Sequence, residues 1–168
     1  STCALGGTCD LSEQMLLTCS GAGNCASGGY IDKASDYIKN KGLPSEDCYG
    51  YDPEATACSP GSGWTSQLHT IDGWAYVATE KPTAAAIKNA LAATGPLVTT
   101  MDVYEDFYDY YSGGVYTYTS GAYVGSHAVL IVGYQDDSAY QGGGYFRVKN
   151  SWGTGWGESG FFRIAYSE

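Results

Sequence analysis

The sequence predicts an α+β protein in which a helical, cysteine-rich part, residues 1–66, precedes a mostly antiparallel β part, residues 67–168. Three observations support this class. All six cysteines lie in the first part, helical hydrophobic patterns occur twice before the middle of the chain, and most later segments alternate apolar and polar residues. At 168 residues the chain can bury a core of its own, as one compact domain or two small lobes.

Two helices are expected in the first part. In DLSEQMLLTC, the side chain of Asp10 or Ser12 can accept hydrogen bonds from the free amides of a first helical turn. In YIDKASDYIKNKG, apolar residues fall on one face and Gly42 stands where a helix ends. The glycine-rich segment between them predicts a turn. Residues 43–66, rich in Pro, Gly, Ser and Asp, predict a long surface loop.

The cysteines indicate an oxidising compartment. Zinc is the alternative to disulfides, but zinc ligands are commonly separated by about two to four residues, whereas Cys3 and Cys9 enclose five. We therefore expect disulfides, with Cys3 and Cys9 as one local pair and with Cys48 and Cys58 holding the long loop. Such bonds predict a secreted protein or another oxidising compartment such as the lysosome. The chain opens without a charged and apolar leader, which predicts a processed product or a piece of something longer.

Strand patterns dominate after the loop. They run through LHTIDGWAYV, LVTTMDV, HAVLIVGY, YFRVKNSW and GFFRIAY. One helix interrupts them, because KPTAAAIKNALAATG has Pro82 at its start, three successive alanines and Gly95 beyond its end. The tyrosine-rich segment VYEDFYDYYSGGVYTYTSGAY is interpreted as aromatic packing of the β part with its turns, with a sugar-binding or stacking surface as the alternative.

Composition argues against two classes of partner. Lysine and arginine number 8 against 18 aspartates and glutamates, and the resulting net charge of −10 repels phosphate backbones and anionic membrane surfaces. No stretch approaches the ~20 apolar residues that a membrane helix needs. We expect no nucleic acid or membrane partner, and we predict no metal or cofactor.

His127 and Asn150 are the candidate catalytic pair. His127 precedes an apolar strand that can anchor it in a core, and Asn150 ends another. The amide oxygen of Asn150 can accept the proton of one ring nitrogen, which is the arrangement of a base oriented by a further group. Trp152 follows among glycines and can shield that hydrogen bond from water. A structural role is the alternative for a histidine at a strand edge.

Five separated blocks resemble the papain family of cysteine peptidases, in the same order and over essentially all of the chain. They are LSEQMLLTC, the CASGG turn, GPLVTTMDV with its later YYSGGVY, SHAVLIVGY and KNSWGTGWGESGFFRI. The resemblance implies a helical left lobe and an antiparallel β-barrel right lobe, which face each other across a cleft. It implies a cysteine endopeptidase with Cys-His-Asn chemistry, in which His127 is the general base, Asn150 orients it and Trp152 shields the pair.

The resemblance also implies a site for a peptide or protein substrate. Gly28 and Gly29 match glycines whose backbone pairs with extended substrate, with turn geometry as their alternative role. The implied pocket for the second residue before the scissile bond contains Tyr30, Thr100, Ser126 and Ala128.

One disulfide is implied in the same way, between Cys19 and Cys58. The pairing of Cys48 stays open between Cys58, Cys25 and an upstream partner, and Cys25 is left without its usual partner.

The family's nucleophile block, a glutamine followed by C-G-[SA]-C-[WY], does not occur here. The expected cysteine lies about 130 to 150 residues before the histidine and asparagine, which falls before residue 1. Glycines after Cys3 oppose the helix that activates a thiol, so we expect neither Cys3 nor Cys9 to be the nucleophile.

The missing block predicts an incomplete left lobe that lacks its central helix. We expect an N-terminal segment or chain to complete the fold, and this chain alone to be inactive. A non-catalytic papain-like peptide-binding module and an acyl transferase of the same chemistry are the alternative functions.

Overall fold

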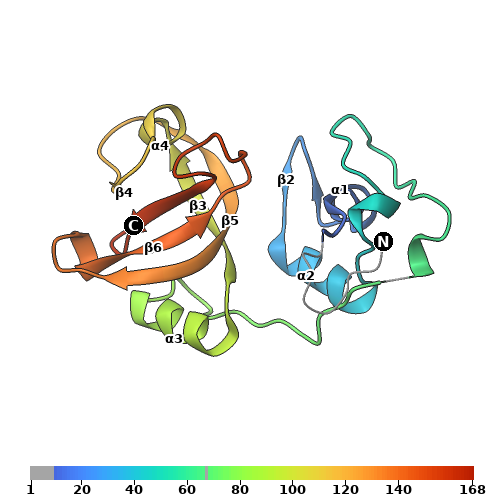
Figure 1. The fold of residues 1–168 in the computed structure, drawn as a ribbon, viewed down its shortest axis with the longest axis horizontal. Coiled ribbons are helices and arrows are strands. Elements are labelled where there is room, and N and C mark those ends of the chain that lie inside the picture. Colours follow the sequence, from blue (N-terminus) through green and yellow to red (C-terminus); the bar gives the residue numbers. More distant parts are fainter. Residues whose placement is uncertain (1–9, 67) are drawn as a thin grey trace. The chain divides into compact units, whose positions relative to one another are not determined.

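The computed structural model describes residues 10–66 and 68–168, which belong to two compact units, residues 1–75 and 76–168 (Figure 1). Each unit has its own secondary structure, and each is described by itself below. The cysteine pair expected near the start of the chain, Cys3 with Cys9, lies outside the described residues. None of the helices in the described part is long and apolar enough to cross a membrane.

Both helices predicted for the first unit are confirmed. Helix α1 begins after Ser12, whose Oγ accepts a hydrogen bond from the backbone N–H of Met15 at 3.1 Å, so Ser12 rather than Asp10 is the cap. Helix α2 ends before Gly42, which adopts a φ of 81° and continues the chain in the left-handed region that favours glycine. The elements are α1 Glu13–Cys19, β1 Gly23–Asn24, β2 Gly28–Gly29, α2 Ile31–Asn40, η1 Glu46–Cys48 and η2 Trp64–Ser66, where η denotes a 3₁₀-helix.

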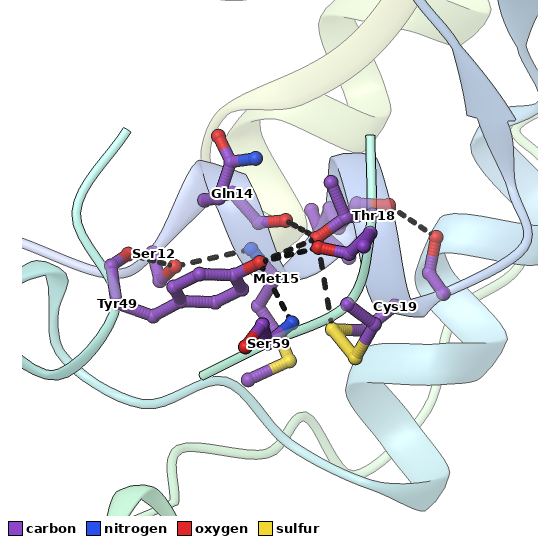
Figure 2. The surroundings of a disulfide bond; sticks show 11 residues. Ser12, Gln14, Met15, Thr18, Cys19, Tyr49 and Ser59 are labelled. Atoms are coloured by element: carbon purple, nitrogen blue, oxygen red, sulfur yellow. Dashed lines mark hydrogen bonds between the residues drawn. A yellow bond between two sulfur atoms is a disulfide. The ribbon is translucent and has the colours of Figure 1, made fainter. Parts of the chain in front are cut away.

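A disulfide and a tyrosine attach the long loop to α1 (Figure 2). Cys19, the last residue of the helix, is bonded to Cys58 over a sequence separation of 39. The hydroxyl of Tyr49 lies 3.0 Å from Thr18 Oγ1 and accepts a hydrogen bond from the backbone N–H of Ser59 at 3.1 Å. The disulfide that the family resemblance implied is therefore present, and the loop is held at both of these points.

Cys48 does not hold the loop, so that prediction was wrong. Cys48 lies in η1 with its Sγ 3.5 Å from Ser45 Oγ, and both it and the exposed Cys25 have free thiols. The partner of Cys58 is instead at the end of a helix, where the two Cα atoms are 4.8 Å apart, within the range a disulfide spans.

We expect replacement of both Cys19 and Cys58 by serine to lower the free energy of unfolding by about 2–4 kcal/mol. The bond restricts the unfolded chain over a long loop, and its removal releases that restriction. Urea denaturation followed by circular dichroism measures the change. Cys25→Ser, which removes an exposed free thiol, is the control and should change stability by less than about 0.5 kcal/mol. A double variant as stable as the control would contradict the stabilising role.

The second unit is one sheet with two α-helices and one short 3₁₀-helix. The strand order is β3-β5-β6-β7-β4, and all pairs are antiparallel except β4 with β7. The predicted helix is confirmed as α3, capped by Thr83, whose Oγ1 accepts from the N–H of Ala86 at 3.2 Å. The elements are α3 Ala84–Thr94, β3 Leu97–Tyr104, α4 Glu105–Tyr110, β4 Val115–Tyr116, β5 Tyr123–Asp136, η3 Gln141–Gly143, β6 Gly144–Lys149 and β7 Phe161–Ala165.

The α+β class is confirmed, and the sheet of the second unit is open. Strands β3 and β4 stand at its two ends and pair with no further strand in the described part of the chain, where a closed barrel was expected. One face of the sheet carries the core, because side chains alternate between the two faces of each strand. The buried cluster consists of Val103, Phe107, Val129, Ile131, Phe146, Val148 and Phe162.

The strand predicted over residues 68–77 is not formed. The pairing of this segment, within the described residues, is a single isolated bridge between His69 and Leu43. Ile71 and Trp74 are exposed despite the alternating pattern. Alternation describes which side chains a strand would bury, but a strand also needs a neighbouring strand to pair with, and within residues 10–66 and 68–168 the β-pairing of this segment is that one bridge.

A helix, α4, replaces part of the aromatic β packing that was expected in the tyrosine-rich segment. Phe107 is completely buried and packs against Tyr111, four residues later, with ring centroids 5.3 Å apart. Glu105 and Asp106 occupy the first turn, where negative charge is favourable. The spacing of the two aromatic residues and the acidic pair before them were the helical signals.

Asp106 fixes the loop that leads into β5. Its Oδ2 accepts hydrogen bonds from the backbone N–H groups of Thr119 and Ser120 at 2.8 and 3.2 Å, and its Oδ1 accepts from the Tyr116 hydroxyl at 2.8 Å. Burial raises the pKa of Asp106, but these hydrogen bonds outweigh burial and hold the pKa below its ordinary value. The carboxylate is therefore stabilised in its charged form.

We expect Asp106→Asn to lower the free energy of unfolding by about 1–2 kcal/mol at neutral pH, because an amide nitrogen cannot accept these hydrogen bonds. A lowered pKa in the folded state means that this contribution is present above the unfolded-state pKa near ~4 and disappears as pH falls through the folded value. The difference in unfolding free energy between wild type and variant, measured by urea denaturation, should thus shrink below about pH 4. Asp109→Asn, on the exposed side of the same helix, is the control; a difference that does not change with pH would contradict this role.

Candidate active site

His127 is held by an inner strand of the sheet, β5, which pairs with β3 and β6. It lies in β5 opposite Met101 of β3, and it is half-buried. Val129 and Ile131, further along the same strand, are in the buried core. The predicted anchoring of His127 by an apolar strand is therefore present.

Asn150 follows directly after β6 and contacts the imidazole. Its Oδ1 lies 2.8 Å from His127 Nε2 and accepts a second hydrogen bond from the backbone N–H of Ser151 at 2.8 Å. A backbone N–H can only donate, so the amide oxygen must face this side, and an amide oxygen can only accept. The proton of the neutral ring therefore sits on Nε2, which leaves Nδ1 of His127 as the basic nitrogen.

The backbone at Asn150 is fixed by a glycine ten residues later. The N–H of Asn150 donates to the carbonyl oxygen of Gly160 at 2.9 Å, and Asn150 is only 7% exposed. Gly160 has a φ of 89°, and a Cβ there would lie 3.3 Å from the Gly153 carbonyl oxygen. Glycine at this position thus allows the loop between β6 and β7 to close on the asparagine.

Trp152 covers the imidazole. The rings of His127 and Trp152 are stacked, with centroids 4.9 Å apart and an angle of 26° between their planes. Trp156 meets Trp152 edge-on at 4.9 Å, and Phe107 lies 6.1 Å from Trp152. The tryptophan therefore rests on the buried aromatic cluster, and it excludes water from one side of the histidine.

The arrangement provides one base and its orienting group. His127 Nδ1 is free to exchange a proton, while Nε2 is engaged by Asn150. Within the part of the chain that the structure describes, Asn150 Nδ2 is buried without a hydrogen-bond partner. The same part contains no group of three or more His, Cys, Asp or Glu side chains that could hold a metal ion.

The predicted substrate-binding residues occur in both units. In the second unit, Thr100 pairs with Ala128 across the sheet, and Ser126 precedes His127; all three are exposed. In the first unit, Gly28 and Gly29 form the exposed strand β2, with Gly28 at a φ of 72°. That value shows that turn geometry also requires a glycine at Gly28.

Tyr30 follows β2 and is 64% exposed, with Lys33 Nζ 4.5 Å from the centre of its ring.

Sequence reasoning missed the support behind the site. Phe107 contacts both Trp152 and Trp156, yet it comes from the segment that was expected to be strand and turn. Asp102 was also missed; it faces Ser126 across the sheet and its Oδ1 accepts a hydrogen bond from the Ser126 hydroxyl at 3.2 Å. The contact between Asp102 and Ser126 could have been inferred from the alternating side chains of β3, once β3 is known to pair with β5, the strand that carries His127.

Comparisons with known proteins agree with this geometry. A model of the papain family cysteine protease domain matches residues 2–168. A cathepsin L-like proteinase of Fasciola hepatica is 38% identical over 157 residues, and a cathepsin B-like protein of Giardia intestinalis is 37% identical over 161 residues. The matches cover 92% and 91% of this chain but only 46% and 52% of those proteins. The chain thus spans about half the length of these curated relatives.

Solved structures give the same result. A digestive procathepsin L of Tenebrio molitor larval midgut superposes with a TM-score of 0.76 at 34% identity, covering 95% of this chain and 51% of that one. The proform of a ragweed pollen cysteine protease superposes with a TM-score of 0.77 at 30% identity, covering 95% of this chain and 48% of that one. The chain has the papain-like fold and belongs to the papain family of cysteine proteases.

Proposed function

We propose that this chain is the larger part of a cysteine endopeptidase and supplies its general base, while the nucleophilic cysteine is on a segment outside residues 1–168. The observation that carries the proposal is the hydrogen bond between His127 Nε2 and Asn150 Oδ1, which leaves Nδ1 available under Trp152. A base fixed by a neutral acceptor and protected from water is what thiol-dependent acyl transfer requires.

The proposed reaction uses His127 twice. The imidazole takes the proton of the cysteine thiol at Nδ1, and the thiolate attacks the peptide carbonyl carbon. The C–N bond then breaks as the imidazolium gives this proton to the leaving amine, and a thioester remains. Water next loses a proton to Nδ1 and attacks the thioester carbonyl carbon. The C–S bond then breaks and the imidazolium returns the proton to the leaving thiolate, so that the carboxylic acid is released and the free thiol is restored.

Asn150 is proposed to keep the imidazole in one tautomer and one orientation through both steps. The amide oxygen carries no formal charge, so the imidazolium is stabilised by a hydrogen bond rather than by an ion pair. Trp152 is proposed to strengthen that bond by excluding water. Gly28, Gly29, Tyr30, Thr100, Ser126 and Ala128 are proposed to bind the peptide.

A completing segment is supported by the shape of the second unit. A cavity of about 640 Å³ lies against the inner face of the sheet and is lined by core residues that include Val129, Phe146 and Phe162. Protein interiors are close-packed and leave few voids of this size. Because the relatives are about twice as long as this chain, we propose that a further segment fills part of this cavity. An oxidising compartment, secreted or lysosomal, is proposed from the disulfide.

The test compares the longer gene product with residues 1–168 alone. A peptidyl epoxide that alkylates active-site thiols should label the longer protein on a cysteine preceding Ser1, and only that protein should hydrolyse peptides. Mass spectrometry of the labelled protein identifies the modified residue. Hydrolysis by residues 1–168 alone would place the nucleophile on one of this chain's own cysteines, and the absence of a cysteine-bearing segment upstream would also overturn the proposal.

A further inference from the structure

A row of four side chains crosses the sheet of the second unit on the face opposite its core. Val98 of β3 pairs with Leu130 of β5, and Leu130 pairs with Lys149 of β6. Lys149 pairs in turn with Phe161 of β7. Paired residues lie on the same face of a sheet, and the face changes with each residue along a strand. Since Val148 is in the buried core, Lys149 and its row, which we call the outer row, face away from that core.

The outer row does not have the composition of a face that meets water. Three of its four side chains are apolar, and Val98 is 60% exposed, whereas the solvated face of an antiparallel sheet is normally polar. The two α-helices of the unit, α3 and α4, pack against the core on the other face. Contiguous apolar side chains on a surface mark interaction sites. The outer row therefore indicates a docking surface, with one ammonium group among its apolar residues.

The ammonium group of Lys149 has no carboxylate partner among the residues that the structure describes, whose ion pairs join Lys88 to Asp136 and Arg163 to Glu158. Arg147 lies two residues before Lys149 and thus on the same face. Its guanidinium stands 4.7 Å from the centre of the Phe161 ring, and it too forms no ion pair with a described residue. Two of the chain's 8 basic residues are therefore unpaired at this place, in a protein with a net charge of −10.

The other charges of this face do not neutralise the outer row. Arg163 lies opposite Arg147, and its own charge is balanced by the bidentate contact with Glu158. Asp102 shares the face, but it pairs with Ser126, four residues along β5 from the residue opposite Lys149. At about 3.3 Å per residue this is roughly 13 Å, beyond the Debye length of ~8 Å at physiological salt. A carboxylate brought to the outer row therefore meets positive charge.

We propose that a segment of the longer protein, outside residues 1–168, docks on the outer row with apolar side chains and places a carboxylate against Lys149. This inference rests on the proposed function, in which a further segment completes the protein, and deepens it by naming a second surface that the segment covers. The relatives are about twice as long as this chain, which leaves room for such a segment. A second copy is the poorer occupant, because two copies that each carry a net charge of −10 repel each other. Docking also removes water from the ion pair, which strengthens an interaction that is weak when it is fully exposed.

The experiment is cross-linking of the longer gene product with a water-soluble carbodiimide. The reagent joins a lysine to a carboxylate in contact with it as an amide, and it takes up the water that is lost and becomes a urea. Mass spectrometry of the digested protein should show Lys149 joined to an aspartate or glutamate that precedes Ser1. The pair of Lys88 and Asp136, 2.7 Å apart, is the control within the same molecule and should be joined with or without the segment. Lys149 joined to a carboxylate of residues 1–168, or to none while Lys88 is joined, overturns the inference.

Two variants test whether the charge of Lys149 is what the segment needs. In the longer protein, Lys149→Met should lower the urea midpoint of unfolding by about 1 M, because it leaves a covered carboxylate without its partner. Lys149→Arg keeps the charge and should retain most of the wild-type stability. In residues 1–168 alone, Lys149→Met should move the midpoint by less than about 0.2 M, as for a surface substitution. Equal midpoints of the methionine and arginine variants of the longer protein would contradict the ion pair.

Neither measurement requires catalysis, so the inference and the proposed function can fail separately. A cross-link from Lys149 to the preceding segment, in a protein that hydrolyses no peptide, supports the docking surface and rejects the peptidase. An active peptidase in which Lys149 is not joined to that segment rejects the docking surface and leaves the proposed function in place.

Discussion

In the complete enzyme, His127→Ala should lower kcat/KM by roughly 10³- to 10⁴-fold, the upper part of the range for a general acid–base catalyst. The variant loses the nitrogen that accepts the thiol proton and later gives it to the leaving amine. Its fold should be retained, because His127 is half-buried and the core lies in its strand neighbours Val129 and Ile131. Hydrolysis of a fluorogenic peptide measures the loss, and circular dichroism checks the fold.

Asn150→Ala is the comparison that assigns the roles. It keeps Nδ1 of His127 but removes the group that accepts the hydrogen bond from Nε2. The loss of kcat/KM should therefore be smaller, about 10²-fold. The pH profile of thiol alkylation should also shift in this variant, because the imidazolium loses a hydrogen bond that stabilises it. Equal activity of wild type and His127→Ala would exclude the proposed mechanism, while a structural role for Asn150 alone would leave the alkylation profile unmoved.

Phe107→Ala should lower the free energy of unfolding by about 3–5 kcal/mol, the typical cost of removing a fully buried phenylalanine. Phe107 has no exposed surface, and its ring lies within 6.1 Å, centroid to centroid, of Tyr111, Tyr116, Trp152 and Trp156. A cavity there removes the support beneath Trp152, so we also expect a change in near-ultraviolet circular dichroism.

Two further variants test whether the loss of stability comes from the packing of the Phe107 ring or from any substitution in this helix. Phe107→Leu keeps most of the volume and should cost less than the alanine variant. Tyr110→Ala is on the same helix, but Tyr110 is 77% exposed, so its effect should be within about 0.5 kcal/mol. Urea denaturation compares the three; if the Phe107→Ala loss were as small as that of Tyr110→Ala, the cluster would not depend on Phe107.

The sequence predicted those elements whose signals are local. Ser12 can cap α1, Pro82 precedes α3 and Gly95 follows it, and the apolar alternation of β6 and β7 follows from a one-sided core. Each of these needs only a short stretch of chain to be recognised. The wrong strand at 68–77 needed a partner strand, which no local pattern can supply.

The site was predictable in part for the same reason. His127 and Asn150 stand in distinctive blocks, so sequence could propose their contact, but the choice of Nε2 as the donor came only from the two hydrogen bonds at Asn150 Oδ1. Phe107 and Asp102 act through tertiary neighbours. Their roles depend on the packing under Trp152 and on the pairing of β3 with β5. Neither can be recognised from the residues and their near neighbours in the sequence.

The bond between Cys19 and Cys58 also matters after the chain has been cut. The loop that it spans is rich in proline and glycine and largely exposed, the kind of segment that proteolytic enzymes nick first. A single cut between the two cysteines leaves both pieces covalently joined. The nicked protein would therefore migrate as one band on a non-reducing gel and as two bands once the disulfide is reduced.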